Sequence, residues 1–187
     1  MKITAISSTP RRHGNSDILI DRVVQTSREL GAEVEKIRIA GLDISPCTAC
    51  DACQDAVETP CVIDDDAPPI LEKFLTSDAI VFGGPIYNFA VAAQLKLLID
   101  RMYSLGGAGH WDTLAGTRLG IVLTYGDEDR SSSGVENALG MFRDMASFIG
   151  VRIEGVVEAS CSAAGEVLKN PAALASAEDL GRRLAGG

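Results

Sequence analysis

The sequence predicts an α/β fold in which helices cover both faces of a parallel sheet. Along the 187 residues, short apolar runs alternate with helical patterns, as expected for repeated strand–helix units. Aromatic residues make up only 5%, whereas the 19 glycines suit the tight turns of such a fold. We therefore expect one doubly wound domain over residues 1–187, whose ligand lies beyond the carboxyl ends of the strands.

The expected strands differ in how continuous their apolar pattern is. Ile37 and Ile39 alternate with the charged residues Lys36 and Arg38, which is typical of a half-exposed edge strand. The third and fourth runs are continuously apolar, as expected of central strands covered on both faces. The strands are expected at residues 2–7, 34–39, 79–83, 119–124 and 151–157.

The helices are indicated by apolar residues that recur on one face. A helix is expected over residues 16–30. It ends before Gly31, and glycine is favoured just beyond a helix end. Ser133 and Glu136 have the spacing of a capping box ahead of a helix that stops at Gly150. Further helices are expected around residues 95–102 and over residues 171–184. The segment at about residues 41–66 lacks periodicity, and we expect an irregular insertion loop there.

Four cysteines in that segment form a C-x2-C-x2-C-x7-C run, namely Cys47, Cys50, Cys53 and Cys61. Four thiolates are the ligand set of one cubic iron–sulfur cluster. Zinc and unliganded, relict thiols remain alternatives, because spacing alone does not determine the metal. Cys161 stands apart from the run and is expected to be a small buried residue.

Charge and hydropathy exclude several functions. The net charge is −9 and the pI is about 4.7, so we expect no nucleic-acid partner and no anionic membrane partner. No apolar stretch approaches the roughly 20 residues that span a bilayer. Met1 leads directly into a strand pattern rather than a signal region. A cytoplasmic location is expected, where metal or redox chemistry explains the cysteines better than disulfides do.

The loop after the first strand, S-S-T-P-R-R-H-G-N-S at residues 7–16, predicts a phosphate site. It precedes a helix, whose free amides attract anions. It lacks both G-x-G-x-x-G and G-K-S/T, so a dinucleotide or triphosphate fingerprint is absent and a phosphate monoester is favoured. The alternative is a polar turn in which Asn15 or Ser16 only caps the helix. The candidate donors are Ser7, Thr9, Arg11, Asn15 and Ser16.

Two further loops are expected to meet the first one. Residues 83–89, G-G-P-I-Y-N-F, follow the third strand, where glycines admit a planar ligand and Tyr87 and Phe89 can flank a ring. Residues 124–127, T-Y-G-D, add another aromatic side chain after the fourth strand. Aromatic residues that pack back on the core are the alternative. Together the three loops predict one cleft with a phosphate end and a ring end.

These blocks resemble the NADPH-dependent FMN reductase family, and within it the iron–sulfur flavoprotein-like branch. Residues 7–16 resemble the family's S-G-S-P-R-K-N-G-N-T. Residues 46–53 with 61–65 resemble P-C-x-G-C-x-x-C…C-x-I-x-D-D, with Ala49 in the glycine place. Residues 83–87 resemble G-S-P-V-Y, and residues 95–101 resemble L-K-x-x-I-D-R. The likeness covers residues 1 to about 105 in the family's order.

The resemblance implies a flavodoxin-like, five-stranded parallel sheet of order 2-1-3-4-5 that binds FMN. The first loop would hold the phosphate through the donors already named. The isoalloxazine would be lined by Pro85, Ile86, Tyr87, Asn88, Phe89, Thr124, Tyr125, Gly126 and Asp127. No catalytic side chain is implied, because the flavin carries the chemistry.

The implied function is electron transfer from NAD(P)H, or from a ferredoxin-like donor, to a small-molecule or protein acceptor. A [4Fe–4S] cluster on Cys47, Cys50, Cys53 and Cys61 would be a second, conditional carrier. A homodimer or homotetramer is expected, with one subunit's cluster near another's flavin. The alternative is a non-catalytic, flavodoxin-like electron carrier whose cysteines are relict or bind zinc.

Three further expectations concern side chains near these blocks. Asp100 and Arg101 are expected to form a structural salt bridge or a subunit contact. Trp111 ends a glycine-rich loop that would form a wall of the site or a subunit contact. It is a candidate for substrate stacking, and an anchor in the core is the alternative. The acidic residues 127–129 would lower the flavin potential, with a solvated turn as the alternative.

Overall fold

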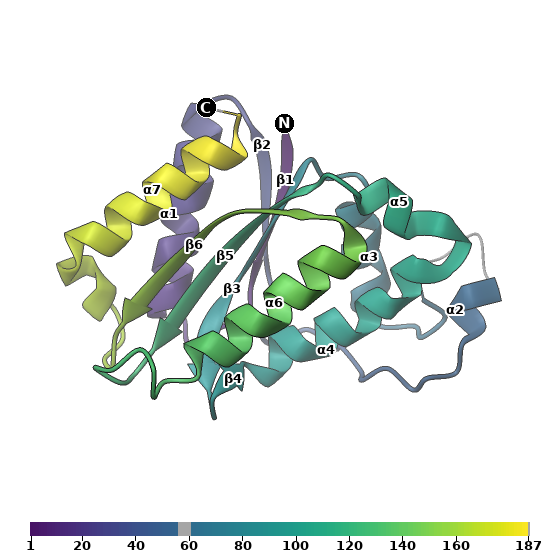
Figure 1. Cartoon of the computed structure of the whole chain (residues 1–187), viewed down its shortest axis with the longest axis horizontal. Coiled ribbons are helices and arrows are strands. Elements are labelled where there is room, and N and C mark those ends of the chain that lie inside the picture. The colour runs from purple at the N-terminus through teal and green to yellow at the C-terminus, as the bar shows by residue number, and fades with distance from the viewer. Residues whose placement is uncertain (56–60, 187) are drawn as a thin grey trace.

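The computed structural model describes residues 1–55 and 61–186, and a six-stranded sheet forms its centre (Figure 1). Five strands are parallel in the order β2-β1-β3-β5-β6, which confirms the predicted arrangement. The two-residue strand β4 pairs antiparallel with the end of β3. The strands are β1 (Lys2–Ser7), β2 (Glu33–Arg38), β3 (Ala79–Tyr87), β4 (Ala90–Val91), β5 (Arg118–Tyr125) and β6 (Arg152–Ser160).

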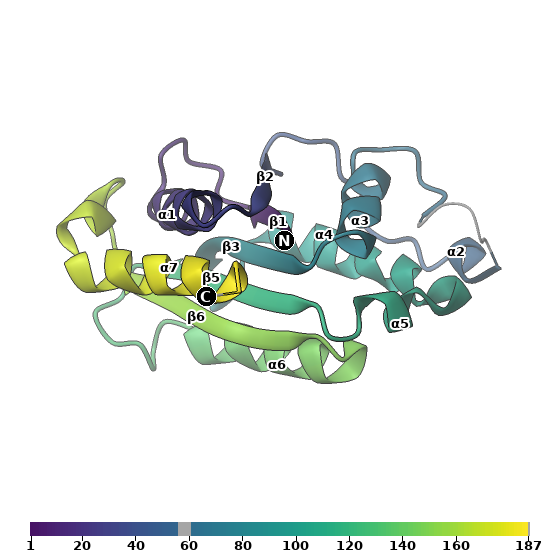
Figure 2. The ribbon, with the colours of Figure 1, turned by 90° about the horizontal axis from the view of Figure 1, so that it is seen from above.

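Helices cover both faces of the sheet (Figure 2). One core cluster lies under α1 and α7, and a second lies under α3, α4, α5 and α6. The helices are α1 (Asn15–Glu29), α2 (Ala52–Asp55), α3 (Ala67–Leu75), α4 (Ala93–Arg101), α5 (His110–Leu114), α6 (Val135–Ile149) and α7 (Pro171–Leu184), with 3-10 turns at Met102–Gly109 and Glu166–Lys169. Within the described residues, none of the helices combines the length and the apolar character that a membrane crossing needs.

The central strands are apolar on both faces, as their unbroken hydrophobic runs predict. Ala79 and Val81 point into the cluster beneath α1 and α7, whereas Ile80 and Phe82 point to the opposite side. The Phe82 ring stacks on Phe142 of α6, with centroids 6.1 Å apart. Each fully buried side chain of this size stabilises the fold by about 1.5–3 kcal/mol, so the sheet and its two helix layers form one packed unit.

Strand β3 extends further than predicted. The expected loop at residues 83–89 is strand as far as Tyr87, because Pro85 still pairs with Thr124 of β5. Proline is tolerated because Gly83 offers its carbonyl to Ser8 on the β1 side, and Pro85 faces that same side two residues later. By then β1 has ended, so no hydrogen bond is lost. The sheet therefore has a step at the carboxyl end of β1.

The start of α6 corrects the predicted capping box. Gly134 occupies the N-cap position with φ 87°, and Ser133 accepts a hydrogen bond from the Val135 amide at 3.2 Å. Glu136 pairs with Arg130 instead of closing the box. Glycine is required at 134 because a Cβ there would lie 2.3 Å from the Phe89 backbone. A close approach between two loops thus overrides the local capping pattern.

Candidate functional site

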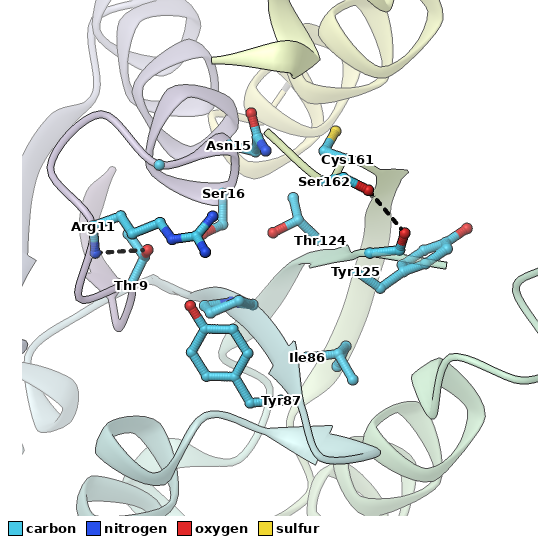
Figure 3. A pocket seen from close by; sticks show the side chains of 13 residues that line it. Thr9, Arg11, Asn15, Ser16, Ile86, Tyr87, Thr124, Tyr125, Cys161 and Ser162 are labelled. Atoms are coloured by element: carbon cyan, nitrogen blue, oxygen red, sulfur yellow. Dashed lines mark hydrogen bonds between the residues drawn. The ribbon is translucent and has the colours of Figure 1, made fainter. Parts of the chain in front are cut away.

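A cleft of about 300 Å³ lies at the carboxyl ends of β1, β3, β5 and β6 (Figure 3). We call it the strand-end cleft. It lies at the step in the sheet, where ligands of doubly wound folds bind. It is lined by Thr9, Arg11, Gly14, Asn15, Ser16, Pro85, Ile86, Tyr87, Thr124, Tyr125, Gly126, Cys161 and Ser162. All three predicted loops therefore meet here, although Ser7, Asn88, Phe89 and Asp127 lie outside the lining.

The loop before α1 makes one end of the cleft suited to an anion. Gly14 is the N-cap residue of α1, and no side chain caps the helix. Neither Asn15 nor Ser16 acts as the cap that the alternative interpretation required. The first amides of α1 are thus available to a ligand. Arg11 is directed into the cleft beside Ser16, while Thr9 accepts a hydrogen bond from the Arg11 amide at 3.3 Å (Figure 3).

Asn15 lines the cleft, and its side chain also bonds the segment after β6. Its Nδ2 donates to the Ala163 carbonyl at 2.8 Å, and its Oδ1 accepts from the Val167 amide at 3.2 Å. The side chain is buried, and both of these hydrogen bonds join it to the segment after β6. Asn15 therefore fastens residues 161–167 against the start of α1 and closes this end of the cleft.

Ser7 lies behind the cleft and donates to Asp17 at 2.6 Å. Asp17 is a buried carboxylate that also pairs with Lys36 at 2.8 Å and with Arg38 at 2.9 Å. Burial by itself would raise the pKa of Asp17, but the hydrogen bonds from Lys36 and Ser7, together with both cations, outweigh it and lower the pKa. The negative charge near the helix N-terminus is thereby balanced by two cations.

The ring end of the cleft is formed by Tyr87, Tyr125 and the backbone around them. Tyr87 is 42% exposed at the mouth. Burial first, and then the carboxylate of Glu158, raise the pKa of Tyr125, so its phenol stays protonated at neutral pH. Asn88 and Phe89 form the two-residue turn between β3 and β4, with φ of 49° and 66°. Phe89 is absent from the lining and is 59% exposed.

The segment after β6 contributes residues that the sequence analysis missed. Cys161 was expected to be buried, but it is half-buried and lines the cleft next to Ser162. The Cys161 amide donates to the Tyr125 carbonyl at 2.7 Å, and Ser162 Oγ donates to the Gly126 carbonyl at 3.0 Å. Burial and the charge of Glu166 raise the pKa of Cys161. Their position in the sequence could have indicated them, because the last parallel strand ends at the same edge of the sheet as the other strands.

The acidic turn at residues 127–129 fits the solvated alternative. All three residues are exposed and lie outside the cleft lining. Asp129 accepts hydrogen bonds from the Ser131 amide and hydroxyl, which lower the pKa of its carboxyl group. An effect of this turn on the flavin potential stays a prediction.

A second pocket brings the four cysteines of the run together with Arg101 and Tyr103, and we call it the cysteine pocket. Its lining shares no residue with the strand-end cleft. In both ribbon views, α2 lies at the opposite end of the molecule from α1 (Figures 1 and 2). Cys47 and Cys50 are exposed, Cys53 is buried and Cys61 is half-buried. Residues 56–60, which belong to the predicted insertion, are outside the described part.

The backbone of the cysteine pocket explains one departure from the family motif. Ala49 has φ 51° and Asp51 has φ 55°, a left-handed conformation on both sides of Cys50. The family's glycine at position 49 adopts that conformation without strain. The Ala52 amide, followed by the Thr48 hydroxyl, lowers the pKa of Cys50, which favours its thiolate.

The fit of a metal to the cysteine pocket is incomplete. The number and chemistry of the thiols suit one [4Fe–4S] cluster. However, within residues 1–55 and 61–186 no three Cys, His, Asp or Glu side chains are arranged to hold a metal ion. The cavity among the cysteines is about 10 Å³, which is room for one water molecule at most. The donor set matches a cluster, but the segment must open to take one.

Arg101 pairs with Asp65 rather than with its neighbour Asp100, which corrects the expected salt bridge. Its Nη1 lies 2.6 Å from Asp65 Oδ2, and both side chains are almost fully buried. Asp100 forms an exposed pair with Lys96 instead. Burial by itself would raise the pKa of Asp65, but the hydrogen bonds from Arg101 outweigh it and lower that pKa. Asp65 also accepts from the amides of Ser45 and Ala67, so this one pair holds both ends of the cysteine segment.

Trp111 does not line the strand-end cleft. The glycine-rich stretch before it is a 3-10 turn that leads into α5, rather than an open loop. Its ring packs edge-to-face on Phe148 of α6, with centroids 6.2 Å apart, and contacts the core. The stacking role is therefore not supported within this chain, and the residue anchors α5 to α6.

Residues 1–154 match a family model described as NADPH-dependent FMN reductase. An iron–sulfur flavoprotein of Methanosarcina thermophila is 41% identical over 101 residues, which are 54% of this chain and 52% of that protein. An FMN-dependent NADH:quinone oxidoreductase of Methylobacterium radiotolerans is 33% identical over 132 residues, which are 66% of this chain and 64% of that protein.

A solved structure of a Trp repressor binding protein from Bacillus subtilis superimposes with a TM-score of 0.72 at 25% identity. The superposition covers 95% of this chain and 99% of that one. The chain spans about half the length of the iron–sulfur flavoproteins that it matches.

Proposed function

Because the chain belongs to the NADPH-dependent FMN reductase family, we propose that it is an oxidoreductase that holds FMN in the strand-end cleft. It would use FMN to pass electrons from NAD(P)H to a second substrate. The observation that carries this proposal is the meeting of an uncapped helix N-terminus and two tyrosines in one cleft. When bound, FMN supplies both the hydride-accepting and the electron-releasing chemistry.

The anion end of the cleft supports a phosphate monoester. The first amides of α1 point toward the ligand, and Arg11 adds a positive charge beside them. The hydroxyls of Thr9 and Ser16 line the same space. Asn15 holds the closing segment in place through Ala163. Ser7 is engaged by Asp17 and would support the loop from behind.

The ring end supports an exchange of electrons at an open face. Tyr87 lies at the mouth, where its partly exposed ring can contact a flavin and leave space for a second planar molecule. Tyr125 and Cys161 have raised pKa values, so both stay protonated and add no negative charge beside a reduced flavin. No side-chain acid or base is required of this chain.

The cysteine pocket supports a second carrier, one [4Fe–4S] cluster bound by Cys47, Cys50, Cys53 and Cys61. An iron–sulfur flavoprotein is similar to this chain over 101 residues, and the four thiols already share a pocket. The pocket and the cleft share no lining residue, and we propose that electrons pass between them from one subunit to another. We therefore propose a homodimer or homotetramer that brings one chain's cysteines to another chain's cleft.

The proposal is tested on anaerobically purified protein by its visible spectrum, by flavin extraction, and by iron and acid-labile sulfide analysis. Oxidation of NADH and of NADPH is then followed with a quinone or free FMN as the acceptor. Stoichiometric FMN with nucleotide oxidation is expected. Tight FMN without turnover would instead establish an electron carrier, and absence of flavin after reconstitution would contradict the cleft assignment.

Arg11 and its neighbour Arg12 provide a matched pair of variants for the FMN site. Arg11 lines the cleft, whereas Arg12 is exposed and does not. A charge-assisted hydrogen bond contributes about 1.5–3 kcal/mol, so Arg11→Ala should weaken FMN binding about 10- to 100-fold. Arg12→Ala should change it little. Fluorescence titration of the apoprotein with FMN measures both, and equal affinities would place the phosphate elsewhere.

A further inference from the structure

Arg101 is a buried cation whose Nε–H donor is unpaired among the described residues. Its side chain is fully buried at the end of α4. Nη1 donates to Asp65 and to the Ser45 carbonyl, and Nη2 donates to Asp65 and to the Ile63 carbonyl. Nε is also buried, yet it has no hydrogen-bond partner in the part of the chain that the structure describes. Buried donors are rarely left unpaired, so this one indicates a missing acceptor.

The surroundings of Arg101 show which acceptor is available. Arg101 lines the cysteine pocket together with all four thiols. Of these thiols, Cys61 lies two residues before Ile63, whose carbonyl already accepts a hydrogen bond from Arg101 Nη2. A thiol is a weak acceptor, whereas a thiolate is a strong one. A metal-bound cysteine sulfur is a thiolate, so it would be the stronger acceptor for the unpaired Nε–H of Arg101.

We propose that Arg101 is a positioning residue of the cysteine pocket, whose Nε donates a hydrogen bond to the Cys61 sulfur when that sulfur binds the cluster. The inference rests on the cluster proposed above. Asp65 orients the guanidinium, and the main-chain carbonyls of Ser45 and Ile63 keep it in its plane. The positive charge beside one thiolate favours the more negative, reduced state of the cluster. Arg101 thereby raises the reduction potential and fixes the fourth ligand across the gap in the motif.

The experiment compares four proteins after anaerobic reconstitution with iron and sulfide: wild type, Arg101→Lys, the double variant Asp65→Asn with Arg101→Gln, and Lys96→Gln. Arg101→Lys keeps a positive charge for Asp65 but has no Nε–H. The double variant removes both charges together, so neither is left buried alone. Lys96→Gln is the control, because it changes an exposed cation on the same helix. FMN content reports correct folding in each protein.

Iron and sulfide content, the EPR spectrum of the reduced cluster and its midpoint potential are measured in each protein. The double variant should hold FMN but have a lower cluster potential, by about tenfold in the one-electron equilibrium, or about 59 mV. Arg101→Lys should shift the potential in the same direction by less, and Lys96→Gln should match wild type. If the double variant does not fold, Arg101→Lys decides alone.

Two results would overturn the inference, and they are distinguishable. A wild-type protein that takes up no cluster refutes the proposed cluster, and the role of Arg101 with it. A wild-type cluster whose potential and EPR spectrum are unchanged in every folded Arg101 variant leaves the cluster standing and removes Arg101 from it.

Discussion

The strand-end cleft and the cysteine pocket differ in what holds them open. The cleft is formed by the ends of four hydrogen-bonded strands and already has a volume of about 300 Å³. The cysteine pocket lies on an irregular segment, and its cavity is about 10 Å³. One site is preformed by the sheet, whereas the other depends on a side-chain pair, Asp65 and Arg101, that joins distant segments. The cleft therefore offers space to a ligand as it stands, whereas the cysteine pocket would have to open to take a cluster.

Because of this difference, we expect substitutions in one site to leave ligand binding at the other site unchanged. The sheet and both helix layers are complete without the cysteine segment, because the core clusters draw on strands and long helices. Loss of the cysteines should leave the flavin site intact. Loss of the pair that anchors the segment should instead affect stability, since Asp65 and Arg101 are buried together.

The largest expected effect is the loss of the cluster alone. Replacing Cys47 and Cys53 by serine removes two of four thiolate ligands, so iron and sulfide should fall to background while FMN content stays at the wild-type level. Metal analysis and flavin extraction measure both quantities. Cys161→Ser, in the cleft, is the control that should retain iron. Parallel loss of flavin and iron in the double serine variant would show that the sites are coupled.

The next effect separates a buried pair from an exposed one. Asp65→Ala leaves the Arg101 charge buried without its partner, which should lower the free energy of unfolding by about 3–5 kcal/mol. Asp100→Ala breaks only the exposed pair with Lys96 and should cost about 0.3–0.5 kcal/mol. Urea unfolding of the FMN-bound proteins compares the two. Similar losses in both variants would mean that Asp65 does not anchor the cysteine segment.

A smaller effect is expected where the cleft is closed by Asn15. Asn15→Ala removes two hydrogen bonds and leaves the buried amide of Val167 unpaired, which should destabilise the protein by about 1–3 kcal/mol. FMN should also bind more weakly, while iron content should not change. Asn137→Ala is the matched control, since that amide bonds the Phe89 carbonyl outside the cleft. Unaltered FMN affinity in Asn15→Ala would exclude a closing role.

The smallest effect is a dependence of stability on acid. The pKa of Asp17 is lowered from its ordinary value of 3.8, so its ion pairs stabilise the fold above that pH. The contribution is lost as the pH falls through the lower, folded-state pKa. Wild type should therefore lose stability more steeply than Asp17→Asn below about pH 4. Urea unfolding at a series of pH values measures the slopes, and equal slopes would contradict the assignment.

The arrangement of the strands could be predicted because the pattern of apolar and charged residues along each strand indicates how far it is buried. The continuously apolar runs at residues 79–83 and 119–124 indicated central strands, and the alternating run of β2 indicated an edge. The closing helix, Pro171–Leu184, was also confirmed at both ends. Asn170 caps its start by accepting a hydrogen bond from the Ala173 amide. Local patterns suffice where local and tertiary preferences agree.

The remaining features depend on contacts between distant residues. Gly84 and Pro85 resemble a turn, yet pairing with β5 keeps them in strand β3. Ser133 and Glu136 resemble a cap, but the approach of the Phe89 backbone requires glycine between them. Asp65 and Arg101 are separated by 36 positions, so no local pattern could pair them. The flavin contacts stay predictions, both for the residues that line the cleft and for Asn88, Phe89 and Asp127 outside it.

The outer edges of the sheet have a consequence for aggregation. Both edge strands carry charged side chains, including Glu33 and Glu35 on β2 and Arg152 and Glu154 on β6. Charges on an edge disfavour pairing with a strand of another molecule. Where β3 projects beyond β1, Pro85 has no amide hydrogen to offer. Copies of this chain should therefore associate through helices and loops, and not by extending the sheet from one molecule to the next.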